Sequence, residues 1–395
     1  MTAEPTDDAL LPPEGRLLLL AAQAYPDAGA AARLARTISE GVDWDRFLTT
    51  AHAHGVHPLA ARTLLACAAN LVPAREQQVL RGWLHRTLAR NLQLLRGLEA
   101  MLNLFQAAGI PVVCLKGPGL AITGYGGLDA RASNDLDLLV PPGQLGQATA
   151  TLLAAGFTRP YPHLTPEEAD YFLLDFGYHQ SFFRQRDRLT VELHWSLGHE
   201  DLGVAEVAES FWSRCHKAEA EGVSLPVMSP VETLLFQARH AAAHGWNVLR
   251  HLCDFHAAAR RLAPDDWARV AAEARRTQQT AALGVSVLLV REYFGEAIPG
   301  PVGSLMGTDR HIHRLARLAT RGLRDNLRRG TFHAPSFALP WLLQPGIVAW
   351  LRRLQSLSHP CIHERNWIRL PRPLWPLYYV LRPLRLAIKY GRRIG

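Results

Sequence analysis

The sequence lacks the features that mark secreted, disulfide-bonded and membrane-spanning proteins. It has only five cysteines, and none of them shows the paired spacing of a disulfide scaffold or a zinc site. No apolar run is long enough to cross a bilayer, and the first residues are acidic rather than basic. These absences favour a globular protein of the reducing cytoplasm.

Positive charge is also scarce in most of the chain. The formal net charge is +8, but residues 341–395 hold ten basic residues and a single acidic one, which leaves about −1 for everything before them. A protein that follows a nucleic-acid template needs a basic binding surface. The charge distribution therefore argues against a template-using polymerase.

The most informative stretch contains two aspartates on a predicted strand. Residues 131–140 read as an apolar strand that carries Asp135 and Asp137. Residues two apart on a strand share a face, so both carboxylates project together while Leu136 and Leu138 point into the core. Two like charges on one apolar strand favour a bound divalent cation, because hard cations prefer carboxylate oxygens.

A glycine turn precedes this strand in the sequence. Residues 110–115 predict a short buried strand, which is followed by Lys116 and by the turn Gly117-Pro118-Gly119 at the start of a helix. Glycine lets a backbone approach a phosphate, and a helix N-terminus favours an anion. Steric need for glycine in a strand-to-helix turn is the alternative explanation.

A third carboxylate lies on a later predicted strand. Residues 178–184 and 189–195 predict two strands joined by a polar turn. Alternation places Glu192 and His194 on one face of the second strand, with Val191 and Leu193 on the other. Glu192 is thus a candidate partner of the two aspartates.

Helical patterns lie on both sides of these strands, which indicates an α+β protein with a small mixed sheet between helical regions. The main helices are predicted near residues 17–24, 30–38, 76–108, 145–155, 230–244, 249–256, 264–276, 280–294 and 310–327, with Asp43 as the N-cap of another. The predicted divisions are an N-terminal helical region (1–108), an α/β core (109–225), a C-terminal helical domain (226–340) and a basic, aromatic, Pro-rich tail (341–395).

Two pairs in the C-terminal helical region have helical spacing. His240 and His244 lie one turn apart on the same face. This spacing suits a metal, but packing between helices is the favoured interpretation, because the His-Glu-x-x-His pattern is absent. Arg250 and Asp254 have the i,i+4 spacing of an ion pair.

The tail mixes aromatic residues with arginines. It is consistent with contact to a membrane surface or with an acidic partner, and equally with a basic segment packed on the body of the protein.

The order of these features resembles the nucleotidyltransferase superfamily of the DNA polymerase β type, and within it the bacterial group of uncharacterised nucleotidyltransferases. The matching segments are Ile110–Gly117, Arg131–Val140, Val191–Trp195 and His240–His244, and together they lie within roughly residues 40 to 260. Gly117-Pro118 stands where the general superfamily has Gly-Gly or Gly-Ser.

The resemblance implies a metal site and a nucleotide site. Asp135, Asp137 and Glu192 would be the catalytic carboxylates and would hold Mg²⁺ or Mn²⁺, with Glu192 on the acceptor side. Lys116, Gly117, Arg131 and Ser133 would contact the phosphates of the NTP, with ATP as the expected co-substrate. His194 would orient Glu192 or the substrate.

The implied activity is transfer of a nucleoside monophosphate from an NTP to an unidentified small-molecule, peptide or protein acceptor. A catalytically inactive nucleotide-binding or regulatory protein with the same fold stays open as an alternative. So does a toxin–antitoxin-like modifier of another protein. The expected location is the cytoplasm, with the tail as a contact to the membrane periphery.

Overall fold

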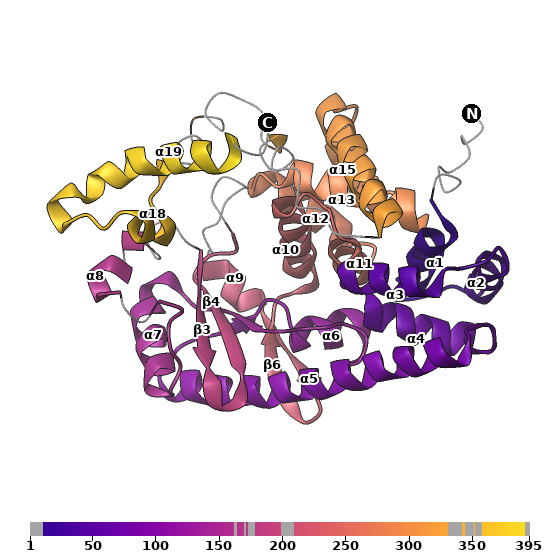
Figure 1. The fold of residues 1–395 in the computed structure, drawn as a ribbon, viewed down its shortest axis with the longest axis horizontal. Helices are drawn as coiled ribbons and strands as arrows, with labels where there is room; N and C mark the ends of the chain where they lie inside the picture. The colour runs from indigo at the N-terminus through magenta and orange to yellow at the C-terminus, as the bar shows by residue number, and fades with distance from the viewer. Residues whose placement is uncertain are drawn as a thin grey trace.

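The protein has an α+β fold in which helices flank one mixed sheet (Figure 1). The computed structural model describes residues 11–161, 164–169, 171–172, 178–198, 209–330, 342–343, 351 and 358–391. The predicted fold class is thus confirmed. Within these described ranges, no helix combines the length and the apolar character needed to cross a membrane.

Six strands form the sheet in the order β3-β4-β2-β1-β6-β5. Their bounds are β1 Val113–Cys114, β2 Leu136–Leu139, β3 His179–Arg184, β4 Leu189–His194, β5 His216–Ala220 and β6 Val223–Val227. β2 pairs in parallel with β4 and antiparallel with β1, while β1 pairs in parallel with β6. The antiparallel hairpins β3–β4 and β5–β6 complete the two edges.

The hairpin β5–β6 is absent from the sequence predictions. Its turn is Glu221-Gly222, and both residues have positive φ, 47° and 79°. Such turns match the twist of paired strands and favour glycine. The Glu-Gly pair beside the alternating residues 223–227 was the signal available in the sequence.

Each predicted helix is present with similar bounds. The bounds of the helices are α1 Pro13–Ala21, α2 Ala30–Ser39, α3 Trp44–Ala53, α4 His57–Cys67, α5 Ala74–Ala107, α6 Pro118–Tyr125, α7 Leu145–Ala154, α8 Pro166–Ala169, α9 Glu209–Arg214, α10 Pro230–Ala243, α11 Leu249–Ala259, α12 Asp266–Arg276, α13 Thr280–Phe294, α14 Gly300–Met306, α15 Arg310–Arg329, α18 Ile362–Trp367 and α19 Tyr378–Gly391. Of these, α8, α9, α14, α18 and α19 are absent from the sequence predictions. Asp43 caps α3, as predicted, by accepting a hydrogen bond from the Arg46 backbone N–H at 3.0 Å.

The long helix α5 covers one face of the sheet (Figure 1). Leu98, Met101 and Phe105 of α5 lie in the same buried cluster as Leu136 and Leu138 of β2. Leu139, on the other face of β2, belongs to a smaller cluster with side chains of α9 and α10. The sheet therefore has one fully covered face and one face on which polar side chains are accommodated.

The helices before and after the sheet share a single hydrophobic core. Leu17, Phe47 and Leu64 from the N-terminal helices belong to one buried cluster with Leu234 and Leu283 from the C-terminal helices. Helices far apart in the sequence are thus packed together above the end of α5 (Figure 1). The predicted domain boundaries themselves stay a prediction.

Candidate active site

Asp137 and Glu192 lie side by side on neighbouring strands. They are direct partners in the parallel register of β2 and β4. Val191 and Leu193, the neighbours of Glu192, are buried on the α5 side of the sheet, as the alternation predicted. Two carboxylates separated by 55 positions in the sequence are thereby placed next to each other on one face.

Asp137 is more enclosed than Glu192, with 2% of its surface exposed. The Lys116 Nζ lies 2.8 Å from its Oδ1, and the Nε2 of His194 lies 3.3 Å from the same oxygen. Burial alone would raise the pKa of Asp137, but Lys116 and the nearby His194 hold that pKa well below its usual range. Asp137 is therefore a stable anion at neutral pH.

The imidazole of His194 lies between the two carboxylates. Its Nε2 is 3.7 Å from Glu192 Oε2, and its ring stacks on that of His179 at 4.9 Å between centroids. Burial lowers the pKa of His194, yet the nearby carboxylates of Asp137 and Glu192 raise it overall. Burial and the neighbouring His194 lower the pKa of His179 to about 4. The two stacked rings therefore differ in proton affinity.

Asp135 comes immediately before β2 rather than within it. Burial, followed by the negative charge of Asp137, raises its pKa. The acidic and imidazole atoms that lie within 4.8 Å of one another belong to Asp137, Glu192 and His194, and Asp135 is not among them. A cation bound near a carboxyl group with a raised pKa would stabilise its ionised form and lower that pKa.

The donor set fits a divalent cation. Asp137 and Glu192 offer carboxylate oxygens, and a buried anion such as Asp137 requires compensating positive charge. The Lys116 ammonium supplies one such charge. Oxygen ligands of this kind suit Mg²⁺ or Mn²⁺.

Gly117 forms the turn between β1 and α6. Its φ is 65°, and a Cβ atom at this position would lie 3.3 Å from the backbone oxygen of Asp135. The backbone of the turn thus packs directly against the start of the aspartate strand. Only glycine adopts this conformation without strain.

Replacing Gly117 with alanine should destabilise the protein by about 1–3 kcal/mol, because the new side chain is strained at positive φ. Urea denaturation measures this. Gly146→Ala on α7 is the matched control, since its added Cβ meets nothing within 4 Å. That control should be neutral or stabilising by about 0.5–1 kcal/mol, and equal losses in both variants would contradict the strain.

Arg131 binds another protein side chain. Its Nε and Nη2 donate to the two oxygens of Asp254 at 2.8 and 2.9 Å, and Tyr125 donates to the same carboxylate at 2.7 Å. Arg131 also donates to Ser133 Oγ at 3.2 Å. The predicted ion pair between Arg250 and Asp254 is therefore wrong. Both carboxylate oxygens of Asp254 accept hydrogen bonds from the guanidinium group of Arg131 instead.

A basic cavity of about 420 Å³ begins beside Ser133 and Asn134. Arg86, Arg90 and Arg250 line it, and none of its lining residues is acidic. Arg90 donates to the Asn134 backbone oxygen at 2.7 Å. Sequence reasoning missed these arginines, because they come from α5 and α11 and meet only in the fold.

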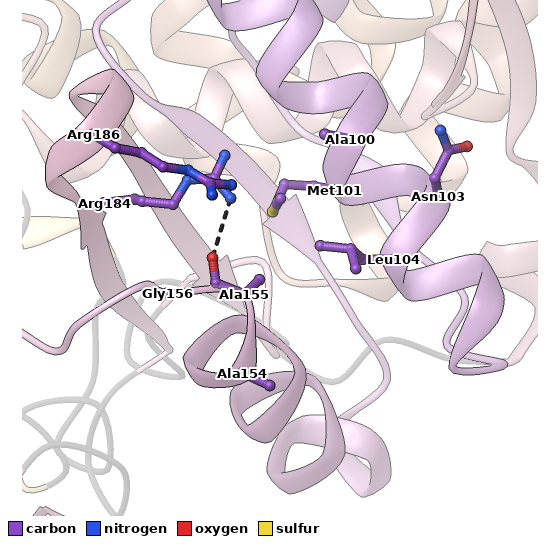
Figure 2. A pocket seen from close by; sticks show the side chains of 9 residues that line it. All are labelled: Ala100, Met101, Asn103, Leu104, Ala154, Ala155, Gly156, Arg184 and Arg186. Atoms are coloured by element: carbon purple, nitrogen blue, oxygen red, sulfur yellow. Dashed lines mark hydrogen bonds between the residues drawn. The ribbon is translucent and has the colours of Figure 1, made fainter.

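A second cavity, of about 630 Å³, lies between α5, the end of α7 and the β3–β4 turn (Figure 2). Arg184 at its wall donates to the Ala155 backbone oxygen at 3.4 Å and also pairs with Asp187 (Figure 2 shows the first contact). None of the predicted site residues lines this cavity. It therefore adds nothing to the carboxylate site.

Comparison with known protein families identifies a match that includes this site. A model of the family described as "Uncharacterised nucleotidyltransferase" matches residues 40–295. The match includes the glycine turn, the aspartate strand, Glu192 and helices α10 and α11. No curated protein and no solved structure matches.

Proposed function

The chain belongs to the family of uncharacterised nucleotidyltransferases, and we propose that it transfers a nucleoside monophosphate from an NTP to an acceptor in a metal-dependent reaction. The observation that carries the proposal is the register of Asp137 opposite Glu192, directly beside the Gly117 turn. In the reaction an acceptor oxygen bonds to the α-phosphorus while the bond to the leaving pyrophosphate breaks. ATP is the proposed co-substrate.

Asp135, Asp137 and Glu192 would hold Mg²⁺ or Mn²⁺. A bound cation of this kind neutralises charge on the phosphates and activates the acceptor hydroxyl. Asp137 contributes a permanent anion, because its pKa lies well below the usual range. Glu192 is more exposed than Asp137, with 25% of its side chain accessible against 1%, so it faces the acceptor side.

His194 is proposed to orient Glu192, and the Glu192 carboxylate is proposed to receive the acceptor proton. The Nε2 of His194 is within 4 Å of both carboxylates, and the raised pKa of His194 keeps a proton between them. The Lys116 ammonium, 2.8 Å from Asp137, can move to a phosphate oxygen when a metal neutralises Asp137. Gly117 would let the turn backbone approach the same phosphates.

The basic cavity is the proposed binding site for the phosphates of the NTP. Arg86 and Arg250 line it beside Ser133, and hydrogen bonds from guanidinium groups to phosphate are strong. Ser133 keeps its predicted role as a phosphate contact. Arg131 takes a different role in the proposal: it fixes the backbone before the aspartate strand through Asp254.

Labelled nucleotides test the reaction. The protein is incubated with Mg²⁺, cell extract and ATP labelled on either the α- or the γ-phosphorus. Nucleotidyl transfer predicts label on an acceptor from α-labelled ATP alone. Label from the γ-position would indicate phosphoryl transfer instead, and saturable binding without any transfer would support the inactive, regulatory alternative.

The tail is proposed to contact the surface of an anionic membrane at its cytoplasmic face. Val380, Leu384 and Ile388 of α19 are 69%, 51% and 43% exposed and recur every four residues, so they form one apolar face. The exposed residues Arg369 and Arg372 lie before the helix. Apolar side chains next to basic ones suit anionic lipid headgroups.

The orientation of α19 is fixed by contacts on its other side. Arg382 and Arg385 both pair with the buried carboxylate of Glu364 in α18. Tyr378, also buried, donates to the Ile368 backbone oxygen at 2.8 Å. The apolar face therefore cannot turn inward without breaking these bonds.

Val380→Glu combined with Leu384→Glu should reduce binding to phosphatidylserine-containing vesicles by about tenfold or more, since burial of each side chain contributes about 1.5–3 kcal/mol. Vesicle sedimentation measures this, with neutral vesicles as the reference. Leu153→Glu, at an exposed leucine of α7, is the matched control. Unchanged binding of the double variant would exclude the membrane contact and leave an acidic partner.

A further inference from the structure

Three histidines meet where α10 ends and α11 begins. His240 and His244 come from the end of α10, and His251 comes from the first turn of α11. Their ring centroids lie 4.8 Å (240–244), 5.2 Å (240–251) and 4.9 Å (244–251) apart. One nitrogen from each ring lies within 4.8 Å of the other two. His251 therefore joins the two histidines, His240 and His244, whose spacing was noted in the sequence.

The loop that joins the two helices is held in place by the core. Trp246, with a φ of 51°, is buried and donates from Nε1 to Ser286 Oγ at 2.9 Å. Asn326 donates to the Asn247 backbone oxygen at 2.8 Å, and the Leu249 backbone N–H donates to His54 Nδ1 at 3.1 Å. The three imidazoles are therefore presented by a rigid frame rather than by a flexible loop.

His251 has an unsatisfied polar atom. Only 5% of this residue is exposed, and its Nδ1 has no hydrogen-bond partner. A buried imidazole nitrogen without a partner costs free energy unless something binds it. Its neighbours His240 and His244 also make ring contacts with it.

The imidazoles are held in the form that binds metals. Burial, followed by neighbouring positive groups, places the pKa of His240 and of His251 well below the usual value, and it lowers that of His244 as well. Lys116 and Arg250 are among those positive groups. Neutral imidazole nitrogens coordinate a cation without first releasing a proton.

We propose that His240, His244 and His251 form a binding site for Zn²⁺ or a similar transition-metal cation, separate from the carboxylate site. Three nitrogens bound to one zinc lie about 3.3 Å apart, so the rings need to move less than about 1 Å each. His244 is exposed and gives the ion access from solvent. Three protein ligands leave a fourth position for water or substrate.

The two sites would select different metals. The histidine site offers only nitrogen ligands, whereas Asp137 and Glu192 offer oxygen, which suits Mg²⁺. Lys116 influences the histidines and pairs with Asp137, so both sites lie around the same side chain. The zinc site is inferred from its own residues and holds whether or not the transfer reaction is found.

Metal titration of the untagged full-length protein tests the site. Zn²⁺ and Co²⁺ are titrated in excess Mg²⁺, with the visible absorption of tetrahedral Co²⁺ as the spectroscopic readout. We expect one Co²⁺ per chain, displaced by Zn²⁺ and not by Mg²⁺. His244→Ala and His251→Ala should each weaken binding by tenfold or more, and because His244 is exposed its variant should retain the fold.

His216→Ala, which removes an exposed histidine of β5, is the matched control and should bind as the wild type does. Glu192→Gln, at the more exposed carboxylate of the other site, should likewise leave Co²⁺ binding intact. The proposal is overturned if the absorption of tetrahedral Co²⁺ never develops, if His244→Ala and His251→Ala bind as tightly as the wild type, or if Glu192→Gln abolishes the Co²⁺ signal.

Discussion

Asp137→Asn should reduce nucleotidyl transfer by about 1,000-fold or more, because a catalytic metal contributes several kcal/mol to the barrier. The amide keeps the shape of the side chain but removes the anion that Lys116 and His194 contact at 2.8 and 3.3 Å. Transfer from α-labelled ATP measures the loss, and the Mg²⁺ concentration for half-maximal rate should rise in any residual activity.

The control for this variant is Asp129→Asn. Asp129 is a partly exposed aspartate that lies 4.0 Å from Arg62, outside the sheet. It should keep full activity. Because Asp137 is buried, circular dichroism and thermal unfolding must show that Asp137→Asn is folded. A folded Asp137→Asn protein with wild-type activity would refute the catalytic assignment.

Breaking the pair between Arg131 and Asp254 should destabilise the protein by about 3–5 kcal/mol, because the partner left behind is a buried, uncompensated charge. Arg131 is 7% exposed and Asp254 1%. Asp254→Asn is the appropriate variant, and urea denaturation measures the change. Activity should also fall, since Arg131 fixes the residues before the aspartate strand.

Two further measurements separate a charge effect from a packing effect. The double variant Arg131→Met with Asp254→Leu removes both charges and should recover a large part of the lost stability. Arg269→Met, at an exposed arginine of α12 paired with Asp266, should cost less than about 1 kcal/mol. If the double variant is less stable than Asp254→Asn, the pair contributes through packing rather than charge.

The pH dependence of stability gives the same pair a distinct signature. Burial would raise the pKa of Asp254, but Arg131 lowers it overall. Its contribution is therefore complete above the unfolded-state pKa of about 3.9 and is lost as pH falls through the lower folded-state value. The wild type should lose this increment in acid, whereas Asp254→Asn has none to lose.

Local patterns in the sequence predicted much of the fold correctly. Alternation along a strand predicted correctly that Leu136 and Leu138 are buried while Asp137 faces away from α5. The side-chain oxygen of Asp43 predicted a helix start, because it satisfies a backbone N–H that the helix leaves unpaired. These features depend on residues a few positions apart, so a single sequence contains the whole signal.

The wrong predictions concerned contacts between residues that lie far apart in the sequence. Helical spacing favoured Arg250 for Asp254, but Arg131, more than 100 positions earlier, offers both guanidinium donors from across the core. The hairpin β5–β6 was also missed, although its Glu221-Gly222 turn was a local signal. Its pairing with β1, by contrast, joins segments that lie far apart in the chain, and no local pattern states that pairing.

The sequence by itself determined the α+β class, the glycine turn and the residue types of the carboxylate site, because each follows from short-range geometry and chemistry. Only the tertiary structure decided that Glu192 lies opposite Asp137, that Arg86 and Arg250 share a cavity with Ser133, and that His251 joins His240 and His244. The reason is that these distances are set by the packing of helices and strands on common cores, which joins residues far apart in the chain.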